Sequence, residues 1–319
     1  MPEGNTVRRV AAGQAITVSV PATSANLGPG FDCLGLALGL RDTLTVRTVA
    51  GDGVSVSVTG EGADTLPTDA SHLVARTILR RWAELGFEPA GLEIEADNRI
   101  PHGRGLGSSA AAIVSALAAA DALLPAGFGG GPDALFEAAA LLEGHPDNVA
   151  PAIYGGLTLS WQDGAEFRSV GAPIDAGIVP VVAVPDVELS THRARGLLPA
   201  SVPHDVAAAN GARVALLVRA LTGEPGLLFD GTVDHLHQGF RAEAMPESAA
   251  LIAHLRAEGM AAVVSGAGPT VLVLAADAGQ AQLAADLIES SNTDDDAVRW
   301  RVWMPGVDAA GAKVEVHQR

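Results

Sequence analysis

A glycine-rich loop followed by two serines is the part of the sequence best suited to binding an anion. Gly103, Gly105 and Gly107 precede Ser108 and Ser109, between a predicted strand and an Ala-rich predicted helix that begins at Ser108. Backbone N–H groups at a helix N-terminus attract phosphate, glycine allows close approach, and a serine hydroxyl can bind phosphate or Mg²⁺. The loop is neither a Walker A loop, which ends in GK[ST], nor GxGxxG, because Ser108 stands in place of the last glycine. Taken alone, it is explained equally well as a turn with serine caps.

The composition restricts the partners that the protein can have. The 319 residues include 20 Lys+Arg and 37 Asp+Glu, for a net charge of −17. This charge repels nucleic acid and anionic membranes, so a bound anion needs local donors or a cation. Cys33 is the only cysteine, which excludes a disulfide within the chain and a cysteine-rich metal site. Because the sequence has neither an apolar segment of signal length at its start nor a membrane-spanning run, we expect a cytoplasmic protein without nucleic-acid or membrane partners.

The hydrophobic pattern predicts strands and helices in an irregular order. In the first half we expect strands at 16–20, 43–49, 53–59 and 92–96 and helices at 72–86, 108–124 and 133–144. We expect 43–49 and 53–59 to form an antiparallel pair. In the second half we expect strands at 178–184, 261–265, 270–275, 299–303 and 312–316 and helices near 205–222, 246–258 and 279–289.

This order favours an α+β protein over a doubly wound sheet, since strands and helices do not alternate regularly. The polar stretch at 162–173 is interpreted as a crossing between domains. We therefore expect two domains, at 1–165 and 166–319.

Three sequence motifs resemble those of the GHMP kinase superfamily. They are PATSANLGPGFDCLGLAL at 21–38, PHGRGLGSSAA at 101–111 and VVSGAGPTVLVL at 263–274. The resemblance implies ATP-dependent phosphorylation of a small alcohol by an N-terminal ribosomal-protein-like domain joined to a C-terminal ferredoxin-like domain. The ATP-binding residues that it implies are Pro101, His102, Gly103, Arg104, Gly105, Leu106, Gly107, Ser108, Ser109, Ala110 and Ala111.

Four segments resemble the homoserine kinase family within this superfamily. They are the first motif, HPDNVAPAIYGG at 145–156, LSTHRARGLLP at 189–199 and DHLHQGFRAEAMPE at 234–247. The last departs from the family pattern, with Gly239-Phe240 in place of Pro-Tyr, although Arg241 is retained. The resemblance implies a product, O-phospho-L-homoserine, used in threonine biosynthesis, and it is compatible with a homodimer.

Homoserine is a zwitterion with a hydroxyl group, and family resemblance assigns a residue to each of its polar groups. Arg195 and Arg241 would bind the carboxylate, Asp32 the ammonium group and Asn148 the hydroxyl. The rest of the substrate pocket would consist of Asn26, His145, Asp147, Thr191 and Gly266. Each of these residues by itself has an ordinary structural explanation, such as a surface arginine or a helix cap. Their joint occurrence within the matching motifs favours a substrate site.

The family's magnesium carboxylate lies eight residues before the histidine of the HPDN motif, which implies Glu137 here, with Ser109 as the second ligand. Glu143 is the local rival. The catalytic set implied is therefore Asn148, Ser109 and Glu137, with Mg²⁺ and ATP. The adenine contacts stay unassigned, because Ser71-His72 replaces a pair that commonly contains asparagine.

The resemblance also bears on the mechanism and its alternatives. The family is thought to need no dedicated base, so Asp147 is not expected to remove the hydroxyl proton. The side-chain oxygen of Asn148 is expected to orient the O–H group. A kinase for another hydroxylated acid, such as mevalonate or threonine, and a catalytically silent ATP-binding sensor remain the competing hypotheses.

Overall fold

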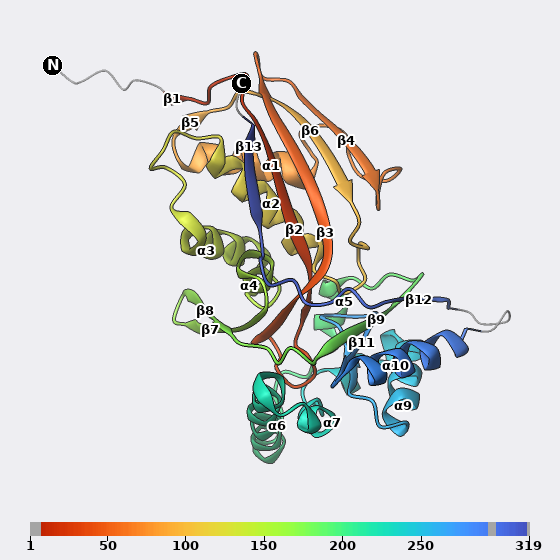
Figure 1. The fold of residues 1–319 in the computed structure, drawn as a ribbon. Helices are drawn as coiled ribbons and strands as arrows, with labels where there is room; N and C mark the ends of the chain where they lie inside the picture. The colour runs from red at the N-terminus through yellow and green to blue at the C-terminus, as the bar shows by residue number, and fades with distance from the viewer. Residues whose placement is uncertain (1–7, 293–297, 318–319) are drawn as a thin grey trace.

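The protein contains two larger β-sheets with helices packed on them and one short two-stranded sheet, seen in a computed structural model that describes residues 8–292 and 298–317 (Figure 1). The strands are β1 (Arg8–Arg9), β2 (Ala15–Ala25), β3 (Leu34–Val49), β4 (Val54–Gly60), β5 (Phe87–Glu88), β6 (Gly91–Asn98), β7 (Leu157–Asp163), β8 (Glu166–Ala172), β9 (Val179–Pro185), β10 (Ala262–Val264), β11 (Val271–Ala275), β12 (Trp300–Trp303) and β13 (Lys313–His317). The helices are α1 (Leu73–Glu84), α2 (Ser108–Ala122), α3 (Gly131–Glu143), α4 (Val149–Tyr154), α5 (Thr191–Gly196), α6 (His204–Gly223), α7 (Leu228–Gly231), α8 (Gln238–Arg241), α9 (Pro246–Ala257) and α10 (Ala278–Ser290), with short 3₁₀ turns at Pro225–Leu227 and Ala242–Ala244.

The larger sheet has seven strands, in the order β13-β2-β3-β6-β4, with β7 pairing β3 and β8 pairing β7. In β2, Ile16, Val18 and Val20 alternate with half-buried residues, as expected for a strand that buries one face. Its register on β3 shifts between Pro21 and Ala22, a place where a residue without a backbone N–H is tolerated. The strand then continues as the buried segment 22–25 of the first motif.

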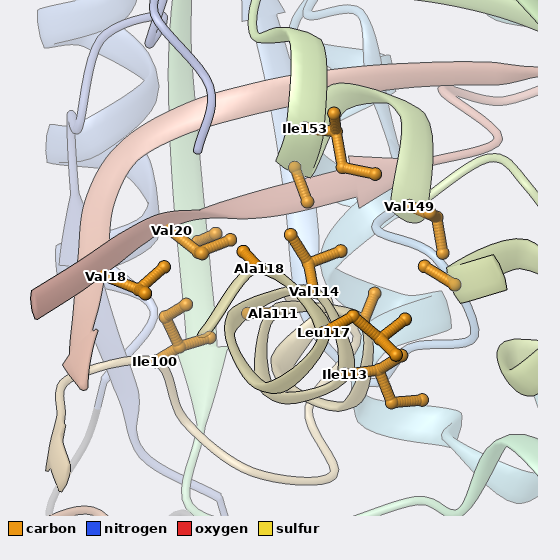
Figure 2. Close-up of a cluster of buried hydrophobic side chains, with 14 of the residues drawn as sticks. Val18, Val20, Ile100, Ala111, Ile113, Val114, Leu117, Ala118, Val149 and Ile153 are labelled. Atoms are coloured by element: carbon orange, nitrogen blue, oxygen red, sulfur yellow. The ribbon is translucent and has the colours of Figure 1, made fainter. Parts of the chain in front are cut away.

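Helix α2 lies at the centre of the first domain. Ala residues and a few larger apolar residues cover nearly its whole circumference, which suits a helix packed on all sides. Figure 2 shows Ala118 of this helix on the side of Val20 of β2, and Ile113 and Leu117 on the other side, where Val149 of α4 lies. This packing fixes the N-terminal end of α2, and therefore the glycine-rich loop before it, relative to β2 and α4.

The second sheet is antiparallel, in the order β10-β11-β9-β12. Helices α9 and α10 pack against it through a separate apolar cluster that contains Leu251, Leu255, Ala284 and Ile288. Helices α6 and α7 contribute Leu217 and other side chains to the main core instead. None of the helices within the described ranges is long and apolar enough to cross a membrane.

Three sequence-based expectations about the fold are corrected. Strand β4 does not pair with β3, because β6 lies between them and β4 runs parallel to β6. The stretch at 162–173 is not a simple crossing, since β7 and β8 form a hairpin around Gly164. The expected boundary after residue 165 therefore falls inside this hairpin, and β13 returns the chain to the larger sheet.

The three motifs meet where the two sheets approach each other. The backbone N–H of Thr23 donates to Leu106 O at 3.0 Å, and that of Gly266 donates to Ala25 O at 3.1 Å. The Ser265 hydroxyl lies 2.8 Å from Ser24 Oγ and 2.7 Å from Gly105 O. Segments that are far apart in the sequence are thus joined by hydrogen bonds around one cleft.

Candidate active site

A cleft of about 670 Å³ opens at this junction. Its walls include the eight residues expected to bind substrate, namely Asn26, Asp32, His145, Asp147, Thr191, Arg195, Arg241 and Gly266. Asn148, Ser108, Ser109 and the glycines Gly103, Gly105 and Gly107 also line it. The cleft therefore places a candidate anion-binding loop beside a polar pocket with charges of both signs.

The N-terminus of α2 is built to receive an anion. Gly107 occupies its N-cap position with φ +71°, a left-handed conformation that favours glycine, and provides no capping side chain. A Cβ at Gly105 would overlap the backbone of Ser265 and Gly268, so this glycine is needed for close packing against the third motif. The first-turn N–H groups of α2 and the helix dipole consequently face the cleft.

The other predicted ATP-binding residues surround the loop without all facing the cleft. Leu106, Ala110 and Ala111 are buried and hold the loop on the core. The Arg104 guanidinium donates to Pro185 O at 2.9 Å and to Asp186 O at 3.1 Å. Arg104 thus attaches the loop to the end of β9, and its charge is directed to these carbonyl groups.

The magnesium carboxylate expected from the motif spacing is placed differently by the structure. Glu137 is exposed on α3 and does not line the cleft, whereas Glu143 does. Ser109 Oγ donates to Glu143 Oε2 at 2.8 Å. The two glutamates are six residues apart, which turns their side chains by about 240° around a helix and separates them by about 9 Å along it. Glu143, the local rival, therefore replaces Glu137 in the candidate site.

The oxygen atoms of Ser109 and Glu143 suit Mg²⁺. No group of three His, Cys, Asp or Glu side chains within 8–292 and 298–317 is arranged to hold a metal ion. Magnesium bound to a nucleotide commonly uses one or two protein oxygens and fills its other positions with phosphate oxygens and water. One carboxylate and one hydroxyl next to the phosphate loop meet that requirement.

His145 and Asp147 form a pair in the wall of the cleft. His145 Nδ1 lies 2.9 Å from Asp147 Oδ1, and its Nε2 lies 3.9 Å from Glu143 Oε1. Burial lowers the pKa of His145, but the hydrogen bond to Asp147 and the charges of Asp147 and Glu143 raise it above its ordinary value on balance. Asp147 is 2% exposed, and its carboxylate orients the histidine ring.

Asp32 and Arg195 form a bidentate ion pair, with Arg195 Nη1 and Nη2 at 3.0 and 2.5 Å from the carboxylate oxygens. Arg241 lies beyond them and is 1% exposed. The ring of Phe31 lies 5.4 Å from each of the two guanidinium carbons and supports both arginines. Burial and the neighbouring positive charge of Arg195 lower the pKa of Arg241. This end of the cleft thus contains two arginines beside the carboxylate of Asp32.

Asn26 organises the turn that presents Asp32. Its Oδ1 accepts the backbone N–H of Asp32 at 3.0 Å, and its Nδ2 donates to Gly266 O at 2.8 Å. Asn26, Leu27 and Asp32 all have positive φ values, of 69°, 49° and 53°, which non-glycine residues seldom adopt. The Asn26 side chain thus holds this turn against the third motif and fixes the position of the carboxylate.

Asn148 stands at the start of α4 but makes no side-chain capping hydrogen bond, so the helix-cap explanation of this residue fails. Its Oδ1 accepts the hydroxyl of Thr23 at 2.8 Å. The asparagine lines the cleft next to Ser108 and Ser109. Its amide therefore lies between the phosphate loop and the charged end of the cleft.

A second, more apolar pocket of about 780 Å³ adjoins the other side of the loop. Leu44, Leu66, Leu73, Val74 and Ala112 supply much of its wall, and Ser108 and Ser109 line both pockets. His72 also lines it, with Nδ1 accepting the backbone N–H of Val74 at 3.2 Å. Burial lowers the pKa of His72 and of His102 on the same wall. The size and apolar character of the pocket suit a flat heterocycle.

Sequence reasoning missed several residues that shape the site. Phe31 lies in the first motif beside Asp32. An aromatic residue next to a substrate-binding motif could have indicated a ring on which arginine side chains pack. His237 is 1% exposed, and its Nε2 lies 2.7 Å from Gly28 O. No spacing rule pointed to Thr23, since a threonine in a strand is ordinary.

Comparisons with known proteins agree with the fold and with the motifs. Residues 72–156 match the family model of the GHMP kinase N-terminal domain, and residues 218–291 match that of the C-terminal domain. The homoserine kinase of Streptomyces avermitilis is 57% identical over 265 residues, covering 83% of this chain and 87% of the relative. That of Streptomyces coelicolor is 52% identical over 302 residues, covering 94% of each chain.

Solved structures confirm the two-domain architecture. The crystal structure of homoserine kinase from Cytophaga hutchinsonii matches with a TM-score of 0.83 and 31% identity, over 94% of this chain and 97% of that one. Mevalonate diphosphate decarboxylase from Staphylococcus aureus matches with a TM-score of 0.63 at 16% identity, which shows a shared fold alone. The motifs that converge on the cleft, the two family models and the relatives above 50% identity together show that the chain belongs to the homoserine kinase family of the GHMP kinases.

Proposed function

We propose that this protein transfers the γ-phosphoryl group of ATP to the side-chain hydroxyl of L-homoserine, which yields O-phospho-L-homoserine and ADP. The observation that carries the proposal is the cleft itself. At one end it has a helix N-terminus suited to phosphate. At the other it has Asp32, Arg195 and Arg241, whose charges suit an amino acid zwitterion. The named relatives are homoserine kinases, which supports the same substrate. In this proposal the product enters threonine biosynthesis.

The charged end of the cleft accounts for recognition of the amino acid. The carboxylate of homoserine would lie against Arg241 and Arg195, whose guanidinium groups share the Phe31 platform. The ammonium group would lie against Asp32, which Arg195 and the Asn26 turn hold in place. A zwitterion aligned antiparallel to the Asp32–Arg195 pair places each of its charges beside one of opposite sign. A hydroxy acid without the amino group gains only half of this interaction.

The donor nucleotide would extend across the loop. Its triphosphate would lie at the N-terminus of α2, and its base would enter the apolar pocket beyond Ser108 and Ser109. These two serines line both pockets, so they mark the place where the phosphates would pass from one to the other. Ser109 and Glu143 would hold Mg²⁺, which supplies charge neutralisation on the phosphate oxygens when bound.

The mechanism proposed for the residues is alignment without a dedicated base. In a loose phosphoryl-transfer transition state the alcohol keeps its proton until late, so position and charge neutralisation can supply most of the rate. Asp147 already accepts a hydrogen bond from His145, which makes it a support for that ring. Asn148 lies beside the phosphate loop and would hold the hydroxyl oxygen for in-line attack.

A coupled ADP-release assay with a panel of acceptors tests the proposal. L-Homoserine, L-threonine, mevalonate and buffer alone are compared at saturating ATP and Mg²⁺, and the product is identified by ³¹P NMR. We expect kcat/KM for homoserine to exceed that of each other acceptor by at least about tenfold. Preference for mevalonate or threonine would refute the assigned substrate, and tight ATP binding without any turnover would support a silent sensor.

A further inference from the structure

Thr23 connects the two halves of the candidate reaction centre. It lies in β2 with none of its surface exposed, and its backbone N–H donates to Leu106 O of the phosphate loop at 3.0 Å. Its hydroxyl donates to Asn148 Oδ1 at 2.8 Å. One residue thus bonds the loop expected to hold the donor phosphate and the amide expected to hold the acceptor hydroxyl.

The contact between Thr23 and the loop is close. A Cβ built on Gly107 would overlap the Thr23 hydroxyl oxygen and would lie 3.1 Å from Asn148 Oδ1. Gly107 is also the N-cap residue of α2, with φ +71°. The hydroxyl is therefore enclosed between the N-terminus of α2 and Asn148, where a shift of either would displace it.

The hydrogen bond from Thr23 also restrains the orientation of the Asn148 amide. An asparagine side chain has one oxygen acceptor and one nitrogen that donates two hydrogen bonds. Since Oδ1 accepts the threonine hydroxyl, Nδ2 is the group turned to the cleft. This refines the sequence-based expectation, in which the oxygen of Asn148 orients the substrate O–H.

We propose that Thr23 is a positioning residue for phosphoryl transfer, which fixes the Asn148 amide so that Nδ2 donates to the hydroxyl oxygen of the acceptor. The proposal rests on the function proposed above. The acceptor oxygen forms a bond to the γ-phosphorus while the bond from that phosphorus to the β–γ bridging oxygen breaks. The hydroxyl proton passes to a phosphate oxygen and then to water, which balances the conversion of alcohol and ATP into phosphate ester, ADP and H⁺.

Donation by Nδ2 has a directional advantage. It occupies one lone pair of the hydroxyl oxygen and leaves the other lone pair for the phosphorus and the O–H proton free to turn to a phosphate oxygen. Without the Thr23 hydroxyl, the asparagine amide could rotate, and either end could face the cleft. The expected loss is therefore in kcat, because misorientation affects the reacting geometry more than ground-state binding.

The test compares Thr23→Ser with Thr23→Ala, two variants that both lack the methyl group and differ by the hydroxyl alone. Thr23→Val adds an isosteric comparison, and Thr158→Val is the control. Thr158 is likewise fully buried in the larger sheet, and its hydroxyl contacts Gly35 O at 3.4 Å, outside the cleft. Melting temperature, kcat, and KM for ATP and homoserine are measured for each variant.

We expect Thr23→Ala and Thr23→Val to lower kcat by about tenfold or more with both KM values within about threefold. Thr23→Ser should retain at least about one third of the wild-type kcat, and Thr158→Val should match wild type within about twofold. In an Asn148→Ala background, Thr23→Val should lower kcat further by less than about twofold, since its effect acts through that amide. ATP hydrolysis without acceptor should change little.

Several results would overturn the proposal. They are an unchanged kcat in Thr23→Ala, equal losses in Thr23→Ala and Thr23→Ser, or a full additional loss in the Asn148→Ala background. A fall in acceptor-free ATP hydrolysis equal to the fall in kcat would place the effect on the phosphate loop instead. If wild type phosphorylates another alcohol, the proposed substrate fails, and the same variants measured with that alcohol still decide the role of Thr23.

Discussion

Glu143→Gln is the most informative single change, because Glu143 lines the cleft beside Ser109 and Glu137 does not, which makes Glu143 the proposed magnesium ligand. The substitution keeps the size of the side chain and an oxygen near Ser109 but removes the negative charge. The native carboxylate lies 2.8 Å from Ser109 Oγ, and its side chain is 12% exposed. Water can therefore compensate only part of the lost charge.

The size of the effect follows from Coulomb's law. Two unit charges about 4 Å apart at an effective dielectric constant of about 20 interact by about 4 kcal/mol. Water entering as a replacement ligand recovers part of this energy, so a net loss of about 2–4 kcal/mol is expected, or about 30- to 1,000-fold in kcat/KM for MgATP. Excess Mg²⁺ should restore part of the activity.

The assay follows ADP release against MgATP at saturating homoserine, and then against free Mg²⁺ at saturating ATP and homoserine. Glu143→Gln should shift the Mg²⁺ midpoint upward and lower the plateau, with a melting temperature near that of wild type. Glu137→Gln is the matched control on the same helix, and it should stay within about threefold of wild type because Glu137 is exposed outside the cleft. A severe loss in Glu137→Gln together with near-normal Glu143→Gln would refute this reasoning and restore the spacing-based ligand.

Five further substitutions test other parts of the molecule. Arg195→Lys should raise KM for homoserine by about tenfold and leave KM for ATP nearly unchanged, because lysine cannot make the bidentate contact with Asp32; a loss confined to ATP would place Arg195 on the other ligand. Asn148→Ala should lower kcat strongly, whereas Asp147→Asn should keep measurable turnover. If Asp147→Asn binds both substrates normally but has no turnover, Asp147 acts as a base. Burial raises the pKa of Asp42 from 3.8 to about 6, and repulsion from Asp97 and Glu61 adds to the rise, whereas the hydrogen bonds from Ile100 and Arg99 oppose it. The protonated carboxyl is therefore favoured in the folded protein. Its contribution to stability is present below pH 3.8 and is lost as the pH rises through about 6. The free energy of unfolding of Asp42→Asn minus that of wild type should accordingly increase by about 2 kcal/mol from about pH 4.5 to 7.5, and a flat difference in urea titrations would contradict the shifted pKa. Among the described residues, Thr270 Oγ1 is the one buried side-chain polar atom without a hydrogen-bond partner. Thr270→Val should therefore raise the free energy of unfolding by about 1 kcal/mol. A loss of stability in this variant would reveal a partner for the hydroxyl.

The phosphate loop and the charged residues of the cleft could be predicted from the sequence, because glycine, serine and arginine at these positions have few alternative uses in combination. Glu137 shows the limit of spacing alone. Helix α3 ends at Glu143, and Gly144 adopts φ +84° as its C-cap, so the chain turns there. The last helical residue, and not the one six positions earlier, consequently faces Ser109.

The sheet topology required information that the sequence does not contain locally. Strands β3 and β4 are neighbours in sequence, but α1 and β6 follow β4, and β6 inserts between the two. The β7–β8 hairpin did have a local signal, since Gly164-Ala165 is a two-residue turn with glycine first, between two strand segments. The burial of His237 had no such signal, because it depends on Gly28, more than two hundred residues away in the chain.

Strand β13 has a consequence for how the chain is made. Lys313–His317 pair with Ala15–Ser19 of β2, and the preceding segment bonds to the same domain through Ala312 N–H to Ile153 O at 3.1 Å. A nascent chain that leaves the ribosome therefore has β2 as an open edge until almost every other element has been synthesised. The second domain is in effect an insertion, and side chains of its sheet, such as Val182 and Leu272, belong to the main core. Removal of β13 should thus expose an aggregation-prone edge in the first domain.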